Sequence, residues 1–147
     1  MVKIQSKAFS FEEIMFQVKS KSSNIGAIST FTGYVRDFQE TNFKSHDHIK
    51  IEHYEGMTQK SLQNIEKFAH TKWDLIETRI IHRVGIIKLN EPIVFIIVAS
   101  KHRDSAFEAC RYIIDYLKIE APFWKKEVSN NHSFWVEQKE SDLNKVK

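Results

Sequence analysis

Apolar residues recur along the chain with two spacings, which predict both helices and strands. The i, i+3, i+4, i+7 spacing of one helical face occurs over residues 10–20, 58–73 and 105–119. Ser10 and Glu13 stand at the start of the first segment with the spacing of a capping box, which satisfies free N–H groups at a helix N-terminus. We therefore expect three amphipathic helices.

Segments rich in β-branched and aromatic residues alternate with these helices and predict strands. The predicted strands cover residues 25–36, 49–54, 76–84, 93–100 and 132–138. Some of them are joined by short turns, and the order of elements lacks the regular βαβ repeat of a parallel sheet. The pattern predicts an α+β fold in a single domain, with a largely antiparallel sheet and packed helices.

Composition narrows the class of protein. Hydrophobic residues make up 41% of the 147 positions, which is enough for a core and argues against disorder. The net charge of +3 is spread along the chain, whereas a nucleic-acid binder usually has a clustered basic footprint. One cysteine excludes an internal disulfide, and the longest apolar run is too short to span a membrane. With no apolar leader, we expect a soluble cytoplasmic protein.

Basic residues at the ends of predicted elements are the main candidates for chemistry. Arg36 ends a predicted strand, and residues in the loops at strand ends often take part in function. The alternative is an ordinary arginine exposed to solvent. His102 and Arg103 lead from an apolar strand into a helix, whose free N–H groups favour an anion such as phosphate. The alternative is an ordinary polar turn, in which Ser105 caps the helix and Glu108 completes a capping box.

Two lysines flank Pro122, which should end the third helix. Lys118 precedes the proline at the helix C-terminus, where a lysine also complements the helix dipole. Lys125 follows two aromatic residues, and a lysine pressed against aromatic rings loses hydration and becomes a better acid, base or nucleophile. An ordinary surface role is the alternative for both lysines. His53 and His82 fall on strand faces and are expected to pack rather than to bind a metal.

Five segments, taken in order, carry a resemblance to a known family. They read GAISTFTGYVR (26–36), IEHYEGM (51–57), IHRVG (81–85), KHRDSAFEA (101–109) and DYLKIEAPFWKKE (115–127). Each is similar, in order and in register, to a stretch of the large, catalytic subunit of molybdopterin synthase. The chain is identified as a member of that family over about residues 25–142.

The resemblance implies a hammerhead-like α+β fold and a sulfur-transfer activity. The family converts cyclic pyranopterin monophosphate into the dithiolene molybdopterin, on the way to the molybdenum cofactor. Sulfur arrives as the C-terminal thiocarboxylate of a small ubiquitin-like partner, whose Gly-Gly tail inserts into the large subunit. The implied assembly is a heterotetramer built on a homodimer of large subunits. No cofactor is expected, and the residues themselves predict no metal site, no membrane span and no nucleic-acid partner.

The resemblance also assigns roles to individual residues. Lys118 and Lys125 match the catalytic lysines, with Lys118 nearest the tail of the partner. The other matched positions are expected to bind the substrate: Tyr34, Val35, Arg36, His102, Arg103, Lys126, Glu127 and Lys139. Lys139 stands where the family has an arginine contributed across the dimer. Lysine keeps the charge but loses the planar fork that binds phosphate with two hydrogen bonds.

Two other functions could use the same basic residues. The first is an α+β nucleic-acid-binding module, which would bind oligonucleotides in a salt-sensitive way. The evenly dispersed charge argues against it. The second is a non-catalytic relative that still docks a ubiquitin-like partner. The presence of both lysines argues against that second function.

Overall fold

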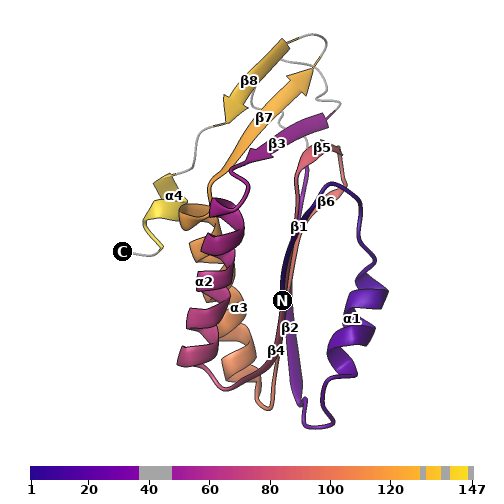
Figure 1. Ribbon diagram of the computed structural model, residues 1–147, viewed down its shortest axis with the longest axis vertical. Helices are drawn as coiled ribbons and strands as arrows, with labels where there is room; N and C mark the ends of the chain where they lie inside the picture. Colours follow the sequence, from indigo (N-terminus) through magenta and orange to yellow (C-terminus); the bar gives the residue numbers. More distant parts are fainter. Residues whose placement is uncertain (37–47, 130–131, 137–139, 146–147) are drawn as a thin grey trace.

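The computed structural model describes residues 1–36, 48–129, 132–136 and 140–145, which form two four-stranded sheets and four helices (Figure 1). Sheet A has the strand order β1 (Val2–Gln5), β4 (Leu75–Arg83), β6 (Pro92–Ser100), β2 (Ala27–Tyr34). Sheet B has the order β5 (Gly85–Lys88), β3 (His48–His53), β7 (Phe123–Ser129), β8 (His132–Val136). The helices are α1 (Phe11–Lys19), α2 (Met57–Lys72), α3 (Arg103–Glu120) and α4 (Glu140–Leu143).

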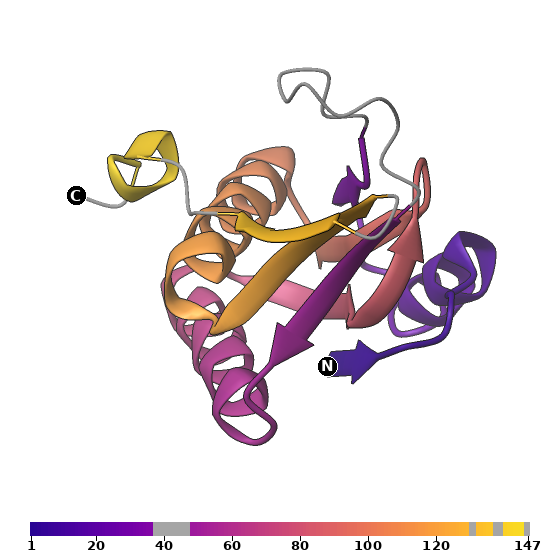
Figure 2. The same cartoon turned by 90° about the horizontal axis from the view of Figure 1, so that it is seen from above.

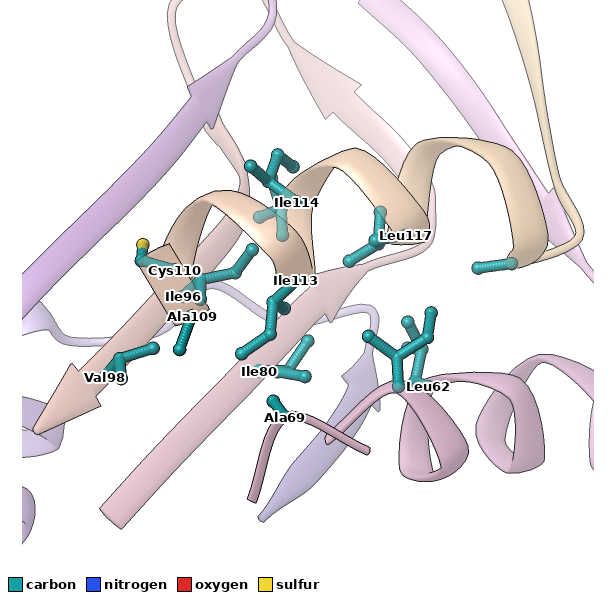
Figure 3. Close-up of a cluster of buried hydrophobic side chains, with 13 residues drawn as sticks. Leu62, Ala69, Ile80, Ile96, Val98, Ala109, Cys110, Ile113, Ile114 and Leu117 are labelled. Atoms are coloured by element: carbon teal, nitrogen blue, oxygen red, sulfur yellow. The ribbon is translucent and has the colours of Figure 1, made fainter. Parts of the chain in front are cut away.

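Helices cover both faces of sheet A, with α2 and α3 on one face and α1 on the other (Figure 1). The alternation of side chains along β6 supplies both interfaces, because successive residues of a strand point to opposite faces. Ile96 packs with Leu62 and Ile113 toward α2 and α3 (Figure 3), whereas Ile97 packs with Val18 toward α1. The nearly continuous apolar sequence of this strand therefore reflects burial on both sides.

Sheet B lies across one end of sheet A (Figure 2). Its inner face buries a small cluster that includes Ile49, Ile51 and Ile87, together with Val35 and Ile93 from the end of sheet A. This junction joins the two sheets and is the place where segments distant in sequence meet. Among the described residues, no helix is long and apolar enough to cross a membrane.

The α+β fold and the three long helices confirm the sequence prediction. Ser10 caps α1 as expected, since its side chain accepts a hydrogen bond from the Glu13 N–H at 3.2 Å. The prediction that Ser105 caps the third helix is wrong, because α3 begins two residues earlier. His102 is the N-cap residue, with the extended backbone angles φ −127° and ψ 146°, and its carbonyl accepts the Ala106 N–H at 3.4 Å.

The sequence pattern predicts one sheet and no strands at the positions of β1, β5 and β7, whereas the structure has two sheets. Strand β1 is short and pairs in parallel with the distant β4, so no local pattern reveals it. Strand β5 follows β4 after one residue, because Gly85 adopts a positive φ of 80° that turns the chain into sheet B. The pairs in both sheets other than β1 with β4 are antiparallel, as the sequence predicted.

Candidate active site

Arg36 lies at the junction of the two sheets, two residues beyond the end of β2. The preceding residue, Val35, is 2% exposed and packs in the inner cluster of sheet B. Its N–H donates to the Glu91 carbonyl at 2.9 Å, and its own carbonyl accepts the Asn90 N–H at 2.7 Å. Because side chain and backbone of Val35 are both engaged, this residue anchors the backbone from which the exposed Arg36 projects.

Lys125 lies on the inner face of sheet B, because side chains alternate along β7. It stands opposite Ile51 of β3, and Glu127, two residues on, stands opposite Ile49. Lys125 is half-buried and Glu127 is 2% exposed. Lys126 points to the other face, where its ammonium lies 5.3 Å from the centre of the Trp135 ring. The structure thus separates the side chain of Lys126 from those of Lys125 and Glu127.

Lys118 lies in the last turn of α3, exposed, at the same end of the molecule as the sheet junction. Helix α3 follows β6 and returns alongside β2, so it ends where β2 leads into Arg36. Pro122 leads from the helix into β7, and its carbonyl accepts a hydrogen bond from the hydroxyl of Thr58 at 3.0 Å. Arg36, Lys118 and Lys125 therefore come from three segments to one end of the fold, and we call them the junction cations.

His102 and Arg103 lie at the opposite end of α3 from the junction cations. Arg103 and Lys118 are about 22 Å apart along the helix axis, since each residue of an α-helix advances about 1.5 Å. That is too far for both side chains to hold the same phosphate. Both His102 and Arg103 are exposed, and the Arg103 guanidinium lies 3.9 Å from the carboxylate of Asp104. Within one chain, the structure does not bring this pair to the junction cations.

The side chain of Tyr34 lies on a different face of sheet A from the junction cations. The half-exposed Tyr34 points to the α1 face of sheet A, where it lines an open groove of about 760 Å³ with Phe11, Phe16 and Phe95. The groove lies across the sheet from α3, so the side chain of Tyr34 is apart from Lys118. Lys139 lies outside the described residues. The substrate-binding roles of both residues stay predictions.

His82 is the residue of the junction that the site prediction did not include. Its ring is buried and stacks on Phe123, with ring centroids 3.7 Å apart. The pKa of His82 is lowered to about 4, mainly by burial and in smaller part by the charges of Lys125 and His53, against a hydrogen bond to the Arg83 carbonyl that raises it. Packing of His82 agrees with the sequence expectation. Its proximity to Lys125 could not be seen in the sequence, because the two residues belong to different sheets.

The cysteine and the acidic residues offer no second reactive centre among the described residues. Cys110 is buried in the core between α3 and sheet A, and burial raises the pKa of its thiol against a hydrogen bond with Ser29 that lowers it. Such a thiol stays protonated and unreactive. No three His, Cys, Asp or Glu side chains in the described ranges are grouped so that they could hold a metal ion.

Comparison with known proteins identifies the family. A sequence model of the family described as MoaE protein matches residues 4–120. The molybdopterin synthase catalytic subunit of Pseudomonas aeruginosa is 41% identical over 141 residues, which cover 96% of this chain and 93% of that protein. The molybdopterin biosynthesis MoaE protein of Burkholderia ambifaria superposes with a TM-score of 0.82 at 34% identity, over 99% of this chain and 97% of that one. The molybdopterin synthase of Staphylococcus aureus gives a TM-score of 0.81 at 31% identity, over 91% and 95%.

These matches agree with the fold described above and with the resemblance seen in the sequence. The family match spans most of the chain, and the chain superposes on the Burkholderia ambifaria structure over nearly its full length. Each of the five motif segments overlaps the matched region, and the junction cations fall on two of those segments, Arg36 on the first and both lysines on the last. This chain belongs to the MoaE protein family.

Proposed function

We propose that this chain is the catalytic subunit of a molybdopterin synthase. It transfers sulfur from the C-terminal thiocarboxylate of a small ubiquitin-like partner to cyclic pyranopterin monophosphate, which becomes the dithiolene molybdopterin. The observation that carries the proposal is the meeting of Arg36, Lys118 and Lys125 at one end of the fold in a member of this family. The buried, protonated thiol of Cys110 agrees with a sulfur source outside this chain.

The junction cations suit a reaction between two anions. The substrate carries a phosphate and the partner carries a thiocarboxylate, so their approach is opposed by charge repulsion unless cations lie between them. Arg36 offers a planar fork for phosphate, and the two lysines offer point charges that can orient the thiocarboxylate and offset charge as the cyclic phosphate opens. Two sulfur atoms require two visits of the partner, and the same phosphate contacts would retain the half-converted substrate between visits.

A second copy of the chain would bring the remaining predicted residues to the same site. Within the described residues, strand β2 lies at one edge of sheet A. It pairs with β6 along one side, and its other side is the open edge of the sheet. Ala27 at its start pairs with Ser100, close to His102, whereas its end leads to Arg36. Antiparallel pairing of two β2 edges about a two-fold axis would set the start of one strand beside the end of the other. His102 and Arg103 of one copy would then approach the junction cations of the other.

We place this assembly in the cytoplasm as a heterotetramer, with the homodimer at its centre and one small partner at each end. One free, buried cysteine needs no oxidising compartment. In this proposal the small partner extends its C-terminal tail to Lys118 and Lys125. A Gly-Gly terminus suits this role, because glycine has no side chain that would clash with the large subunit. Deleting the two glycines of the partner should therefore weaken the complex.

The proposal is tested by reconstitution of the purified chain with the thiocarboxylated partner and the pyranopterin precursor. Wild type should produce molybdopterin, and Lys118→Ala should abolish turnover while its melting temperature and its binding of the partner remain close to wild type. Lys67→Ala, which removes an exposed lysine from the middle of α2, is the matched control and should keep full activity. Full turnover by Lys118→Ala would remove the catalytic assignment. Docking without any turnover by wild type would indicate a non-catalytic relative.

A further inference from the structure

A short connector joins the two elements that carry the lysines of the candidate site. Lys118 lies in the last turn of α3, and Lys125 is the third residue of β7. Two residues, Ala121 and Pro122, lie between the helix and the strand. The direction in which the chain leaves the helix and enters the strand therefore sets where one lysine lies relative to the other.

The connector is held by one hydrogen bond from a distant side chain. Its own backbone bonds are local, since the Ala121 N–H donates to the Leu117 carbonyl at 3.2 Å and the Phe123 N–H donates to the Ala121 carbonyl at 2.9 Å. Pro122 has no N–H to donate. Its carbonyl accepts the hydroxyl of Thr58 at 3.0 Å, across 64 positions of sequence. This bond ties the connector to helix α2.

Thr58 lies in the first turn of α2, and its side chain is fully buried. The hydroxyl does not cap its own helix, because the N-cap residue is Gly56 and no side chain makes a capping bond there. The Thr58 N–H donates to the carbonyl of Tyr54 at 2.9 Å, and Tyr54 directly follows β3. One residue thus links the start of α2, the end of β3 and the connector.

Strand β3 also supports β7 directly. His53, the last residue of β3, stands opposite Phe123, and Ile51 stands opposite Lys125. The start of α2 and the end of α3 both lie next to these strands (Figure 1). The β3–β7 ladder therefore supports Lys125, helix α3 supports Lys118, and the bond from Thr58 is made where the two supports meet.

We propose that Thr58 is a positioning residue, whose hydroxyl holds the Pro122 carbonyl and thereby fixes Lys118 and Lys125 relative to each other. This inference rests on the proposed function, because the positions of the lysines affect turnover only if both take part in sulfur transfer. Thr58 touches no substrate in this role and exchanges no proton. Displacing a reacting group by about 1 Å can lower a rate by about a hundredfold, so a small shift of the connector is enough to be measured.

Two substitutions separate the hydroxyl from the size of the side chain in the reconstituted enzyme. Thr58→Val keeps the branched shape and removes the donor, whereas Thr58→Ser keeps the donor and removes a methyl group. We expect Thr58→Val to lower kcat by about tenfold or more with KM for the pterin within about twofold of wild type, and Thr58→Ser to keep kcat within about threefold. Wild-type kcat in Thr58→Val overturns the proposal, and so does an equal loss of kcat in both variants.

Thr78 of β4 provides a matched control. It is also fully buried, and its hydroxyl donates to Glu66 of α2. It stands opposite Val98, toward the end of β6 that lies away from the sheet junction. Thr78→Val should lower the melting temperature and keep the wild-type kcat, and a loss of kcat as large as in Thr58→Val overturns the proposal. If Thr58→Val does not fold, Thr58→Ala replaces it, because alanine also lacks the hydroxyl and favours a helix.

A measurement without turnover separates this inference from the proposed function. Reductive methylation of the full chain with carbon-13 formaldehyde gives each lysine an NMR signal that reports its surroundings. Thr58→Val should shift the signal of Lys118, of Lys125 or of both, and should leave that of Lys67 in the middle of α2 unchanged. Wild-type signals of both site lysines in Thr58→Val overturn the proposal. Shifted signals in a protein that transfers no sulfur would overturn the proposed function and leave the positioning by Thr58 established.

Discussion

Sheets A and B have the same number of strands and carry different kinds of residues on their covered faces. In sheet A, β6 is buried from Ile93 to Ser100, and helices cover both of its faces. The inner face of sheet B mixes buried Ile49 and Ile51 with Lys125 and Glu127. Strand β6 therefore forms an apolar centre of sheet A, whereas the inner face of sheet B places charged side chains beside buried isoleucines. The chemistry proposed above lies at the junction, where sheet B rests on the end of sheet A.

The largest expected effect on stability comes from the core beneath sheet A. Leu62 is fully buried between α2, α3 and the sheet, so Leu62→Ala should lower the free energy of unfolding by about 2–5 kcal/mol through lost contacts and a cavity. Ile86 in sheet B is 61% exposed and is the control, since Ile86→Ala should change stability by about 0.5 kcal/mol or less. Urea unfolding measures both, and equal losses would contradict the division between the sheets.

The next effect in size is a dependence of stability on pH that comes from His82. The pKa of His82 is about 4 in the folded protein, because the ring is buried, and 6.5 in the unfolded chain. Between these values the unfolded state holds more protons, so stability is full above pH 6.5 and falls as pH drops, by about 3 kcal/mol by pH 4.

Urea unfolding at a series of pH values from neutral to 4 checks this dependence. His82→Phe carries no titrating group at that position, so its stability should fall less steeply over the same range. If the free energy of unfolding falls equally with pH in wild type and in His82→Phe, then His82 is not held in its neutral form in the folded protein.

A smaller effect is expected at the start of α1, on the far face of sheet A. Ser10→Ala removes the side chain that accepts the Glu13 N–H, and should lower the free energy of unfolding by about 1 kcal/mol. Ser10→Asn keeps a capping oxygen and should stay close to wild type. Turnover should remain unchanged in both variants, because the cap lies away from the junction. A loss of activity in Ser10→Ala would show that the α1 face takes part in the reaction.

The sequence predicted the long helices and sheet A well, and sheet B poorly. Helices α1 to α3 have a local periodicity that identifies them, and strand β6 is identified by its continuous apolar run. Strand β7 was missed because its sequence, FWKKEVS, has charges on both faces, and its pairing with β3 joins residues at least seventy positions apart. Tertiary contacts, rather than local preference, decide such a strand.

Sequence reasoning was limited in the same way at the candidate site, because tertiary contacts determine how its residues are arranged. The basic residues could be selected from the sequence, because the resemblance identified them together. Their arrangement could not, since the length of α3 places Arg103 and Lys118 at opposite ends of one helix. The stacking of His82 on Phe123 was equally hidden, because it depends on how the end of sheet A meets sheet B.

Subunit complementation tests the central claim, that a working site joins the junction cations of one copy to Arg103 of the other. Differently tagged Arg103→Ala and Lys118→Ala chains are combined and the mixed dimer is purified by both tags. Each such dimer should contain one intact site and give about half of wild-type turnover, while either variant alone gives none. The reciprocal dimer, wild type with the Arg103→Ala, Lys118→Ala double variant, should be inactive. Activity only in that reciprocal dimer would place all these residues in one chain and contradict the account.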